Sequence, residues 1–371
     1  MKPYIPNELP LQGLDYQALF NVVGNANAEL ARYDGLLQGI PNPEVMLSPL
    51  TTQEAVLSSK IEGTQATVDE VLEHEAGIIA QGEKEKDIQG ILNYRHALFQ
   101  SREHLKDYPI RLGFICELHK ILLDSVRGKD KTPGEFRKDQ NWIGRAGCAI
   151  DEASFVPPSP LVLDEFLKKW ETYMSFDDTD FLLQIAVIHA YFELLHPFKD
   201  GNGRIGRLLI PLFLYQKKAL SQPMFYLSEY LELHREEYYQ RLKAISEDGD
   251  WNGWILFFLK AVAVQAKQNS TRVRSIMDLY EEIKTQIHEI THSQYSIYLL
   301  DAIFSKPIFQ VSDLVKTLNK ECGIHEKTTP ELLRKLKDAN ILRELQPARG
   351  RKSAVLYFPR LINRAEGREI T

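Results

Sequence analysis

Apolar residues recur at helical spacing along most of the chain, which predicts a protein built mainly of helices. The clearest stretch is 180–195, where Ile185, Ile188, His189, Phe192 and Leu195 fall on one helical face. Similar patterns predict helices at about 15–31, 51–61, 65–81, 86–105, 110–126 and 160–175, and further helices from Gly203 to about 290. Pro197 is expected to end the helix before it.

Three stretches do not follow this pattern. Residues 1–13 hold three prolines and predict an extended arm, and residues 35–48 predict a loop. Residues 128–160 carry helix-breaking glycines and prolines. Within them, NWIG (141–144) and ASFVPP (153–158) fit two short strands, so we expect a hairpin at most.

The last part of the chain differs in charge. Residues 293–371 hold fourteen Lys or Arg and nine Asp or Glu, whereas the whole chain has a net charge of −6. A strand from Ile308, helices at 311–318 and 327–339 and a basic strand pair at 342–358 predict a winged helix-turn-helix. DNA binding would use the basic residues of the second helix and the wing tip, which are Arg334, Lys335, Lys337, Arg349, Arg351 and Lys352. A protein-recruiting module is the alternative, because Glu331 and Asp338 lie on the same helix.

Length and composition set the limits on protein class. The 371 residues allow two or three domains, and we expect boundaries at 1–105, 106–290 and 293–371. Hydrophobic residues at 44% and charged residues at 26% are ordinary for a globular protein. The three cysteines form no CxxC pair, and no apolar run is long enough to span a membrane. We therefore expect a cytoplasmic protein without a membrane partner.

The densest chemical signal is the string HPFKDGNGRIGR at 196–207, which lies between two predicted helices. Its close glycines and the following helix start favour an anion-binding nest of backbone amides. Arg204 and Arg207 share one face of the first turn and suit phosphate oxygens. Asp200 is a hard oxygen ligand for Mg²⁺, and His196 is suited to accept a proton. Together these residues predict a site that handles phosphate.

Other interpretations of this string fit poorly. Gly201-x-Gly203-x-x-Gly206 matches a dinucleotide fingerprint, but a helix rather than a strand precedes it. An EF-hand loop would not place Arg204 and Pro211 where it needs oxygen ligands, and a P-loop would need Gly-Lys-Ser/Thr. A plain capped turn would need neither arginine. The remaining histidines, including His189 and His119, are predicted to be packing residues.

The string matches the Fic family motif HxFx(D/E)GNGRxxR at every specified position. The resemblance covers about residues 15–265. GEFRKDQNWIG and FVPP, within about 134–158, resemble the family's flap. Residues 51–63 resemble its inhibitory helix, with (S/T)xxxE(G/N) read as Ser58, Glu62 and Gly63. The tail resembles the winged helix of many bacterial members.

The resemblance implies an all-α core with a small β-hairpin flap, and transfer of AMP from ATP, with Mg²⁺, to a Tyr, Ser or Thr hydroxyl of a target protein. His196 would deprotonate that hydroxyl and Asp200 would hold Mg²⁺. The residues implied to bind the phosphates of ATP are Gly201, Asn202, Gly203, Arg204, Ile205, Gly206 and Arg207. Glu62, with Ser58, would inhibit by a bidentate pair with Arg207. Tyr238 and Tyr239 would stack on adenine, although a helical core role fits one of the two tyrosines equally well, and Ser246 would contact adenine.

Two alternatives remain open on the same sequence. An enzyme of this fold would instead remove AMP or transfer another phosphate-containing group. A DNA-binding regulator would use the Fic domain only to sense nucleotide. The expected partners are a target protein, the protein itself as a substrate, a second copy in a homodimer, and DNA or a protein at the winged helix.

Overall fold

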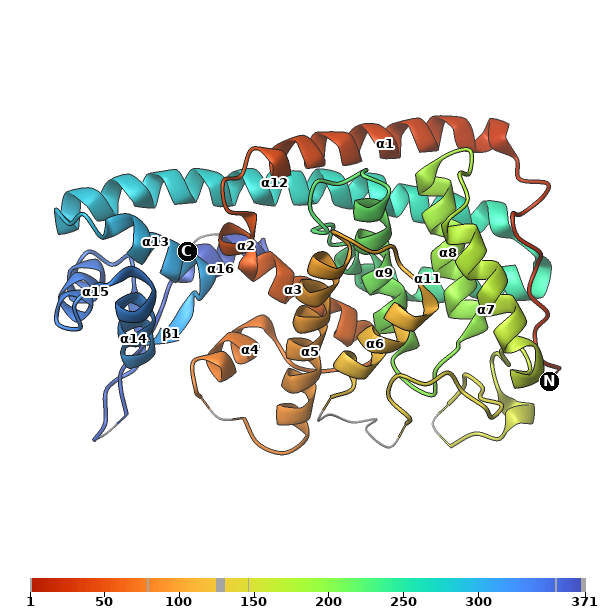
Figure 1. Cartoon of the computed structure of the whole chain (residues 1–371), viewed down its shortest axis with the longest axis horizontal. Coiled ribbons are helices and arrows are strands. Elements are labelled where there is room, and N and C mark those ends of the chain that lie inside the picture. The colour runs from red at the N-terminus through yellow and green to blue at the C-terminus, as the bar shows by residue number, and fades with distance from the viewer. Residues whose placement is uncertain (1, 79, 125–130, 146, 351, 368–371) are drawn as a thin grey trace. The chain divides into compact units, whose positions relative to one another are not determined.

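The computed structural model describes residues 2–78, 80–124, 131–145, 147–350 and 352–367. The chain is mostly helical, as predicted, with three short strands (Figure 1). In order, its elements are α1 (Tyr16–Gln38), α2 (Pro43–Met46), α3 (Ser48–Ile61), α4 (Val68–Glu75), α5 (Glu83–His104), α6 (Leu112–Leu122), η1 (Ile150–Glu152), α7 (Pro160–Met174), α8 (Phe181–Leu195), α9 (Asn202–Gln216), α10 (Ser228–Leu233), α11 (Arg235–Asp248), α12 (Trp251–Thr291), α13 (Ser296–Ser305), β1 (Ile308–Gln310), α14 (Val311–Cys322), α15 (Thr328–Asp338), β2 (Arg343–Gln346), β3 (Val355–Tyr357) and α16 (Pro359–Glu366).

One compact unit holds the motif and consists of the residues up to Asp34 together with Leu57–Thr64 and Gln89–Lys267. Helix α8 lies at its centre and is buried on nearly every side, as expected for a helix that is apolar all round. Trp170 of α7 and Trp254 of α12 each donate an indole N–H to a carbonyl of α8, at 3.0 and 2.8 Å. These bonds satisfy two large buried side chains and fix α8 within the unit.

The turn between α8 and α9 forms where the sequence predicts it. Helix α8 ends at Leu195, directly before the His-Pro pair, and α9 begins at Asn202. His196 caps α8 in the left-handed conformation, with φ 45° and ψ 59°. Gly201 caps the start of α9 with φ 79° and ψ 6°, a conformation that glycine adopts without a steric penalty. The turn therefore contains two residues in the left-handed conformation, His196 and Gly201, within six positions.

The flap is smaller than predicted. NWIG and ASFVPP meet in one antiparallel bridge between Ile143 and Phe155, and neither segment is long enough to count as a strand. The Ile143 N–H donates to the Phe155 carbonyl at 2.9 Å, and the Phe155 N–H donates back at 3.1 Å. Pro157 and Pro158 supply no amide hydrogen, so pairing does not extend further along that segment.

The second compact unit consists of Gly35–Val56, Gln65–Ile88 and the residues from Gln268 onward. Its three-stranded antiparallel sheet has the order β1-β3-β2. The predicted strand at 308 and the two predicted helices after it are confirmed as β1, α14 and α15, whereas α16 is not anticipated by the sequence pattern. Leu314 and Leu318 of α14 and Leu332 and Leu336 of α15 are buried, so the apolar faces of these helices form the core here.

The predicted loop at 35–48 is largely wrong. Helix α1 continues to Gln38, Pro43 begins α2, and Ser48 begins α3. Proline is compatible with the first turn of a helix because the amide there has no intrahelical acceptor. Pro43 therefore marks the start of a helix, whereas the sequence pattern predicts a loop here.

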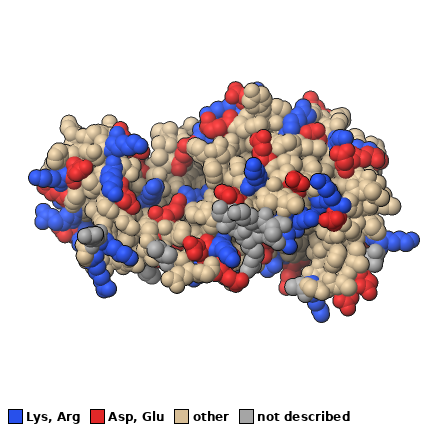
Figure 2. Space-filling model, turned by 60° about the horizontal axis from the view of Figure 1, so that its bottom comes forward, with Lys and Arg blue, Asp and Glu red and all other residues tan. Residues whose placement is uncertain are grey.

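The surface carries charged side chains of both signs. Lys and Arg side chains are interspersed with Asp and Glu side chains on the face drawn in Figure 2. Within the described parts of the chain, no helix has the length and apolar character needed to cross a membrane.

Candidate active site

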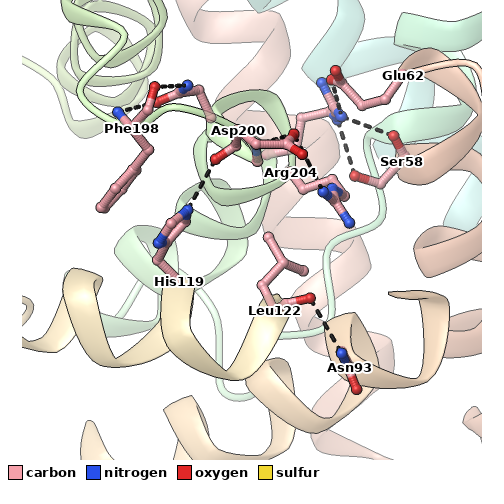
Figure 3. A network of polar contacts seen from close by, with 11 residues as sticks. Ser58, Glu62, Asn93, His119, Leu122, Phe198, Asp200 and Arg204 are labelled. Atoms are coloured by element: carbon pink, nitrogen blue, oxygen red, sulfur yellow. Dashed lines mark hydrogen bonds and ion pairs between the residues drawn. The ribbon is translucent and has the colours of Figure 1, made fainter. Parts of the chain in front are cut away.

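The side chain of Asn202 is one of those that hold the backbone of the turn. Asn202 is 2% exposed, and its amide group makes two 2.8 Å bonds to Phe198 (Figure 3): it accepts from the N–H and donates to the carbonyl. The Phe198 ring is fully buried and stacks on His119 with centroids 3.8 Å apart. These contacts hold the turn in place directly before the start of α9.

The start of α9 faces a carboxylate. The first amides of a helix have no intrahelical acceptor and favour an anion. Glu62, from the residues that follow α3, lies against Gly203 so closely that a methyl group there would overlap its carboxylate. The same methyl group would lie 2.8 Å from the guanidinium of Arg207. Glycine at 203 is therefore needed for an anion to reach this turn.

Arg207 is the most completely buried cation of the site, with 1% of its side chain exposed. Its Nη2 donates to Glu62 Oε1 at 2.7 Å and to the Ser58 carbonyl at 2.8 Å, and its Nε donates to Ser58 Oγ at 3.0 Å. The structure thus brings Ser58, Glu62 and Arg207 together. The pair differs from the expected bidentate one, because a single nitrogen meets the carboxylate and Ser58 takes the other donor.

The electrostatics of this pair favour both charges. Burial alone would raise the pKa of Glu62, but the charge and hydrogen bond of Arg207 outweigh it, so the Glu62 pKa lies below its ordinary value. Burial alone would lower the Arg207 pKa, but Glu62 more than reverses this. The site is therefore a preformed seat for one negative charge, filled by a side chain of the same protein.

Asp200 and Arg204 lie beside this seat. Asp200 Oδ1 accepts from the Gly201 N–H at 2.6 Å and is 3.7 Å from Arg204 Nη2 (Figure 3). The Asp200 side chain keeps 38% of its surface exposed. The described residues contain no cluster of three or more side chains that would enclose a metal ion. One accessible carboxylate fits a Mg²⁺ ion that also takes oxygens from substrate phosphates, which is the usual arrangement for that metal.

His196 is held with its side chain toward the same site. Its Nδ1 lies 3.4 Å from the Glu193 carbonyl oxygen, which favours the proton on Nδ1 and leaves Nε2 to accept one. Burial lowers the pKa of His196 to about 4, although Glu62 and Asp200 raise it. The imidazole is therefore neutral at physiological pH, which is the form that a general base requires.

Not every motif position faces this site. Ile205 is 0% exposed and packs into the core, so only its main chain is available to a ligand. Gly206 lies against Glu193 and His189, where a methyl group would overlap the Glu193 carboxylate. His189 is also 0% exposed and bonds the Gly206 carbonyl and the Tyr238 hydroxyl, so its predicted packing role is confirmed.

The three residues predicted to contact adenine differ from one another in their exposure and hydrogen bonding. Tyr238 is 1% exposed with its hydroxyl bonded to His189 at 2.9 Å, so its ring is not presented for stacking on a ligand. Tyr239 is 43% exposed, and Arg235 lies over its ring at 5.8 Å. Ser246 donates to the Lys243 carbonyl of its own helix. A nearby hollow of about 850 Å³ is lined by residues of α10 and α11, including Leu233, Arg235 and Arg241.

Three residues of the site, His119, Arg137 and Glu193, lie outside the set predicted from the sequence. His119, assigned to packing, accepts from the Gly134 N–H at 2.9 Å and bonds the Asp200 carbonyl at 2.9 Å. Arg137 donates to the carbonyls of the turn. Glu193 is a carboxyl whose Oε1 is buried without a hydrogen-bond partner, and burial raises its pKa to about 8.

The basic residues of the predicted winged helix are exposed or only partly buried. Lys337 pairs with Glu344 at 3.0 Å, and Lys335 donates to the Thr291 carbonyl at 3.4 Å. Arg334 is exposed on α15, and Arg349 and Lys352 are exposed at an isolated bridge between them. Arg351 lies outside the described residues. The described cations among them do not share one acceptor, whereas Arg207 and Arg204 of the motif both interact with Glu62.

Comparison with known proteins adds independent information. Residues 20–103 match the Fic/DOC family N-terminal domain, and residues 109–214 match the Fic/DOC family domain. A probable protein adenylyltransferase of Aquifex aeolicus is 27% identical over 199 residues, which cover 52% of this chain and 57% of that protein. The protein adenylyltransferase Fic of Culex quinquefasciatus is 28% identical over 154 residues, covering 40% of this chain and 27% of that protein. The match thus spans only part of each relative.

Solved structures support the same fold. A Fic family protein from Desulfovibrio desulfuricans aligns over 96% of this chain and 98% of its own, with a TM-score of 0.57 and 19% identity. A Fic domain containing signaling protein from Bacteroides thetaiotaomicron aligns over 68% of this chain and 96% of its own, with a TM-score of 0.55 and 19% identity. The two family matches follow each other along the chain and include the whole string from His196 to Arg207, and we conclude that the chain belongs to the Fic/DOC family.

Proposed function

We propose that this protein transfers AMP from ATP to a Tyr, Ser or Thr hydroxyl of a target protein and that Glu62 restrains the reaction. One observation carries the proposal. A neutral, half-buried histidine, an accessible carboxylate and a fully buried arginine lie around the start of α9, on a turn to which Asn202 is bonded. The relatives named protein adenylyltransferase support the same chemistry.

His196 is the base in this proposal. Its Nε2 accepts the proton of the target hydroxyl as the hydroxyl oxygen forms a bond to the α-phosphorus of ATP. The bond from that phosphorus to the bridging oxygen breaks, and pyrophosphate leaves with the electron pair. Because His196 is neutral at physiological pH, no prior deprotonation is needed.

The start of α9 stabilises the negative charge that develops. The amides of the first turn, with Arg204 and Arg207, bind the phosphate oxygens, and Gly203 allows their close approach. Asp200 would hold Mg²⁺, which neutralises phosphate charge and orients the leaving group. Transfer of this kind depends mainly on positioning and electrostatics, so few reactive side chains are required.

Glu62 competes with the substrate for the same seat. Its carboxylate already binds Arg207 and lies against Gly203, the two features that a triphosphate would use. Productive binding therefore requires Glu62 to leave. Since Glu62 and Arg207 belong to the same chain, the restraint is intramolecular and independent of protein concentration.

The residues from Gln268 onward in the second compact unit, which we call the C-terminal unit, have a separate role in this proposal. The order of α13, β1, α14, α15, β2 and β3 matches the order expected for a winged helix, which supports this assignment. Its basic residues are interspersed with acids, such as Glu344 beside Lys337, which favours recruitment of a protein over DNA binding. The three free cysteines fit a reducing compartment such as the cytoplasm.

Intact-mass spectrometry tests the proposal. The Glu62→Gly protein, incubated with ATP and Mg²⁺ alone and with cell extract, should add the mass of AMP to itself or to an extract protein. The Glu62→Gly protein that also carries His196→Ala should add none, since loss of a general base costs roughly a hundredfold to ten-thousandfold in rate. A different added mass would identify another transferred group. Equal labelling by both proteins would exclude His196 as the base.

A further inference from the structure

The main chain of the predicted catalytic turn is bound by one short segment at the start of the flap. Four successive carbonyls, those of residues 195–198, accept hydrogen bonds from Arg137 and Asn141. Arg137 Nε donates to the His196 carbonyl at 2.9 Å and Nη2 donates to the Leu195 carbonyl at 3.3 Å. The Arg137 N–H donates to the Pro197 carbonyl at 2.8 Å, and Asn141 Nδ2 donates to the Phe198 carbonyl at 3.2 Å.

The same guanidinium also holds both ends of the flap. Arg137 Nη1 donates to the Asp139 carbonyl at 3.3 Å, near the start of the flap. Nη2 donates to the Pro158 carbonyl at 2.6 Å, at its end. The ends of the flap and the end of α8 thus share one donor group. A shift of either flap end changes the bonds that hold His196.

The burial of Arg137 makes these bonds energetically important. Arg137 is 3% exposed, and burial lowers its pKa to about 10. Its hydrogen-bond partners are carbonyl oxygens, including two at the end of α8, where the helix dipole favours a cation. His196 occupies the left-handed region, which is uncommon for a residue with a side chain. The bonds to the turn from Arg137 therefore stabilise a backbone that the sequence of the turn does not favour by itself.

We propose that Arg137 is a positioning residue that couples the flap to the catalytic histidine. By holding both ends of the flap and the His196 carbonyl, it makes the orientation of the imidazole depend on the position of the flap. The inference rests on the proposed role of His196 as the base. It assigns to Arg137 no contact with substrate, only control of where the base points.

The rate of transfer and the affinity for nucleotide separate this role from a purely structural one. In the Glu62→Gly background, Arg137→Gln should lower kcat about a hundredfold, the cost of a base misplaced by roughly 1 Å. The affinity for ATP, measured by titration with a fluorescent ATP analogue, should stay unchanged. Arg137→Ala should recover activity when guanidinium ion is added. Lys138→Gln is the matched control, because it removes only the exposed pair with Glu135 and leaves every bond to the turn in place.

A second readout does not depend on transfer. The imidazole resonances of His196, assigned by comparison with His196→Ala, should move in Arg137→Gln and stay in place in Lys138→Gln. If Arg137→Gln does not fold, Asn141→Ala tests the same coupling, since Asn141 bonds two carbonyls of the turn. Unchanged kcat and unchanged His196 resonances would overturn the inference. Absence of all transfer in the Glu62→Gly parent, with shifted resonances in Arg137→Gln, would overturn the proposed function and leave the coupling intact.

Discussion

Arg207 in the motif and Lys337 in the C-terminal unit each pair with a carboxylate, but only one of the two cations is buried. The carboxylates are similar, with 38% of the Glu62 side chain exposed and 37% of the Glu344 side chain. Arg207 has 1% of its side chain exposed, whereas Lys337 has 42%. The cation, and not the anion, therefore distinguishes the two sites.

This difference determines what each site does with an incoming anion. A buried guanidinium has already lost its water, so it interacts strongly with any negative charge that reaches it. An exposed ammonium remains hydrated, and salt screens its charge. The motif thus offers an anion one buried guanidinium, which suits the phosphate binding proposed for it, and the exposed basic residues around Lys337 offer only weak, general attraction.

For the two ion pairs, the largest effect that this comparison predicts is on stability at Arg207. Arg207→Ala leaves Glu62 without its cation and two acceptors of Ser58 without their donor. The free energy of unfolding should fall by about 3 kcal/mol, the lower end for a broken buried ion pair because Glu62 keeps access to water. Urea denaturation measures this change. A loss below about 1 kcal/mol, typical of an exposed pair, would contradict the comparison.

Glu193 tests burial from the side of the anion. Its pKa in the folded protein, about 8, lies above its ordinary value, so the folded state binds the proton more tightly and loses stability as pH rises through this range. Glu193→Gln cannot ionise, so its stability relative to the parent should rise by about 4 kcal/mol between pH 5 and pH 9. Thermal unfolding across pH measures this change. A difference that stays constant across this range would refute the assignment.

The pH dependence of transfer should be shallow on the acid side. Burial holds the pKa of His196 near 4, and removal of Glu62 takes away a charge that raises it. The Glu62→Gly protein should therefore transfer AMP at pH 5.5 within about twofold of its rate at pH 7.5. Initial rates across this range provide the measurement. A loss of activity centred near pH 6.5 would indicate a solvated imidazole instead.

The smallest effect is expected at Lys337. The coupling energy between Lys337 and Glu344, from a double-mutant cycle with alanine at each position, should be below about 1 kcal/mol and should decrease with added salt. Neither substitution should alter AMP transfer. A coupling as large as that of Arg207 with Glu62 would remove the distinction between the two regions.

The sequence predicts those parts of the site that lie close together in the chain. The string from His196 to Arg207 predicts its own turn and the anion seat because local geometry decides both, whereas the role of His196 as the base belongs to the proposal. Glu62 lies 145 positions from Arg207, and only the family resemblance suggested that the two meet. Hydrophobic spacing also placed α8 and α9 well, since their apolar faces continue up to the motif.

Other parts of the site could not be predicted from sequence for a physical reason. Arg137 and His119 act on main-chain carbonyls 59 and 81 residues away, and any residue type supplies a carbonyl. No partner side chain therefore marks these contacts in the sequence. Tyr238 is bonded inward to His189, which agrees with the helical core role that the sequence pattern left equally open for one of the two tyrosines.

The contact of Glu62 with Gly203 and Arg207 also has a pharmacological meaning. The seat recognises a carboxylate through one guanidinium and one glycine, with no requirement that the carboxylate belong to this chain. A small-molecule carboxylate delivered to the Glu62→Gly protein would therefore act as an inhibitor that competes with the triphosphate. Compounds of that kind would offer a starting point for selective ligands, because the helix end around Ser58 supplies neighbouring hydrogen-bond groups for a larger scaffold.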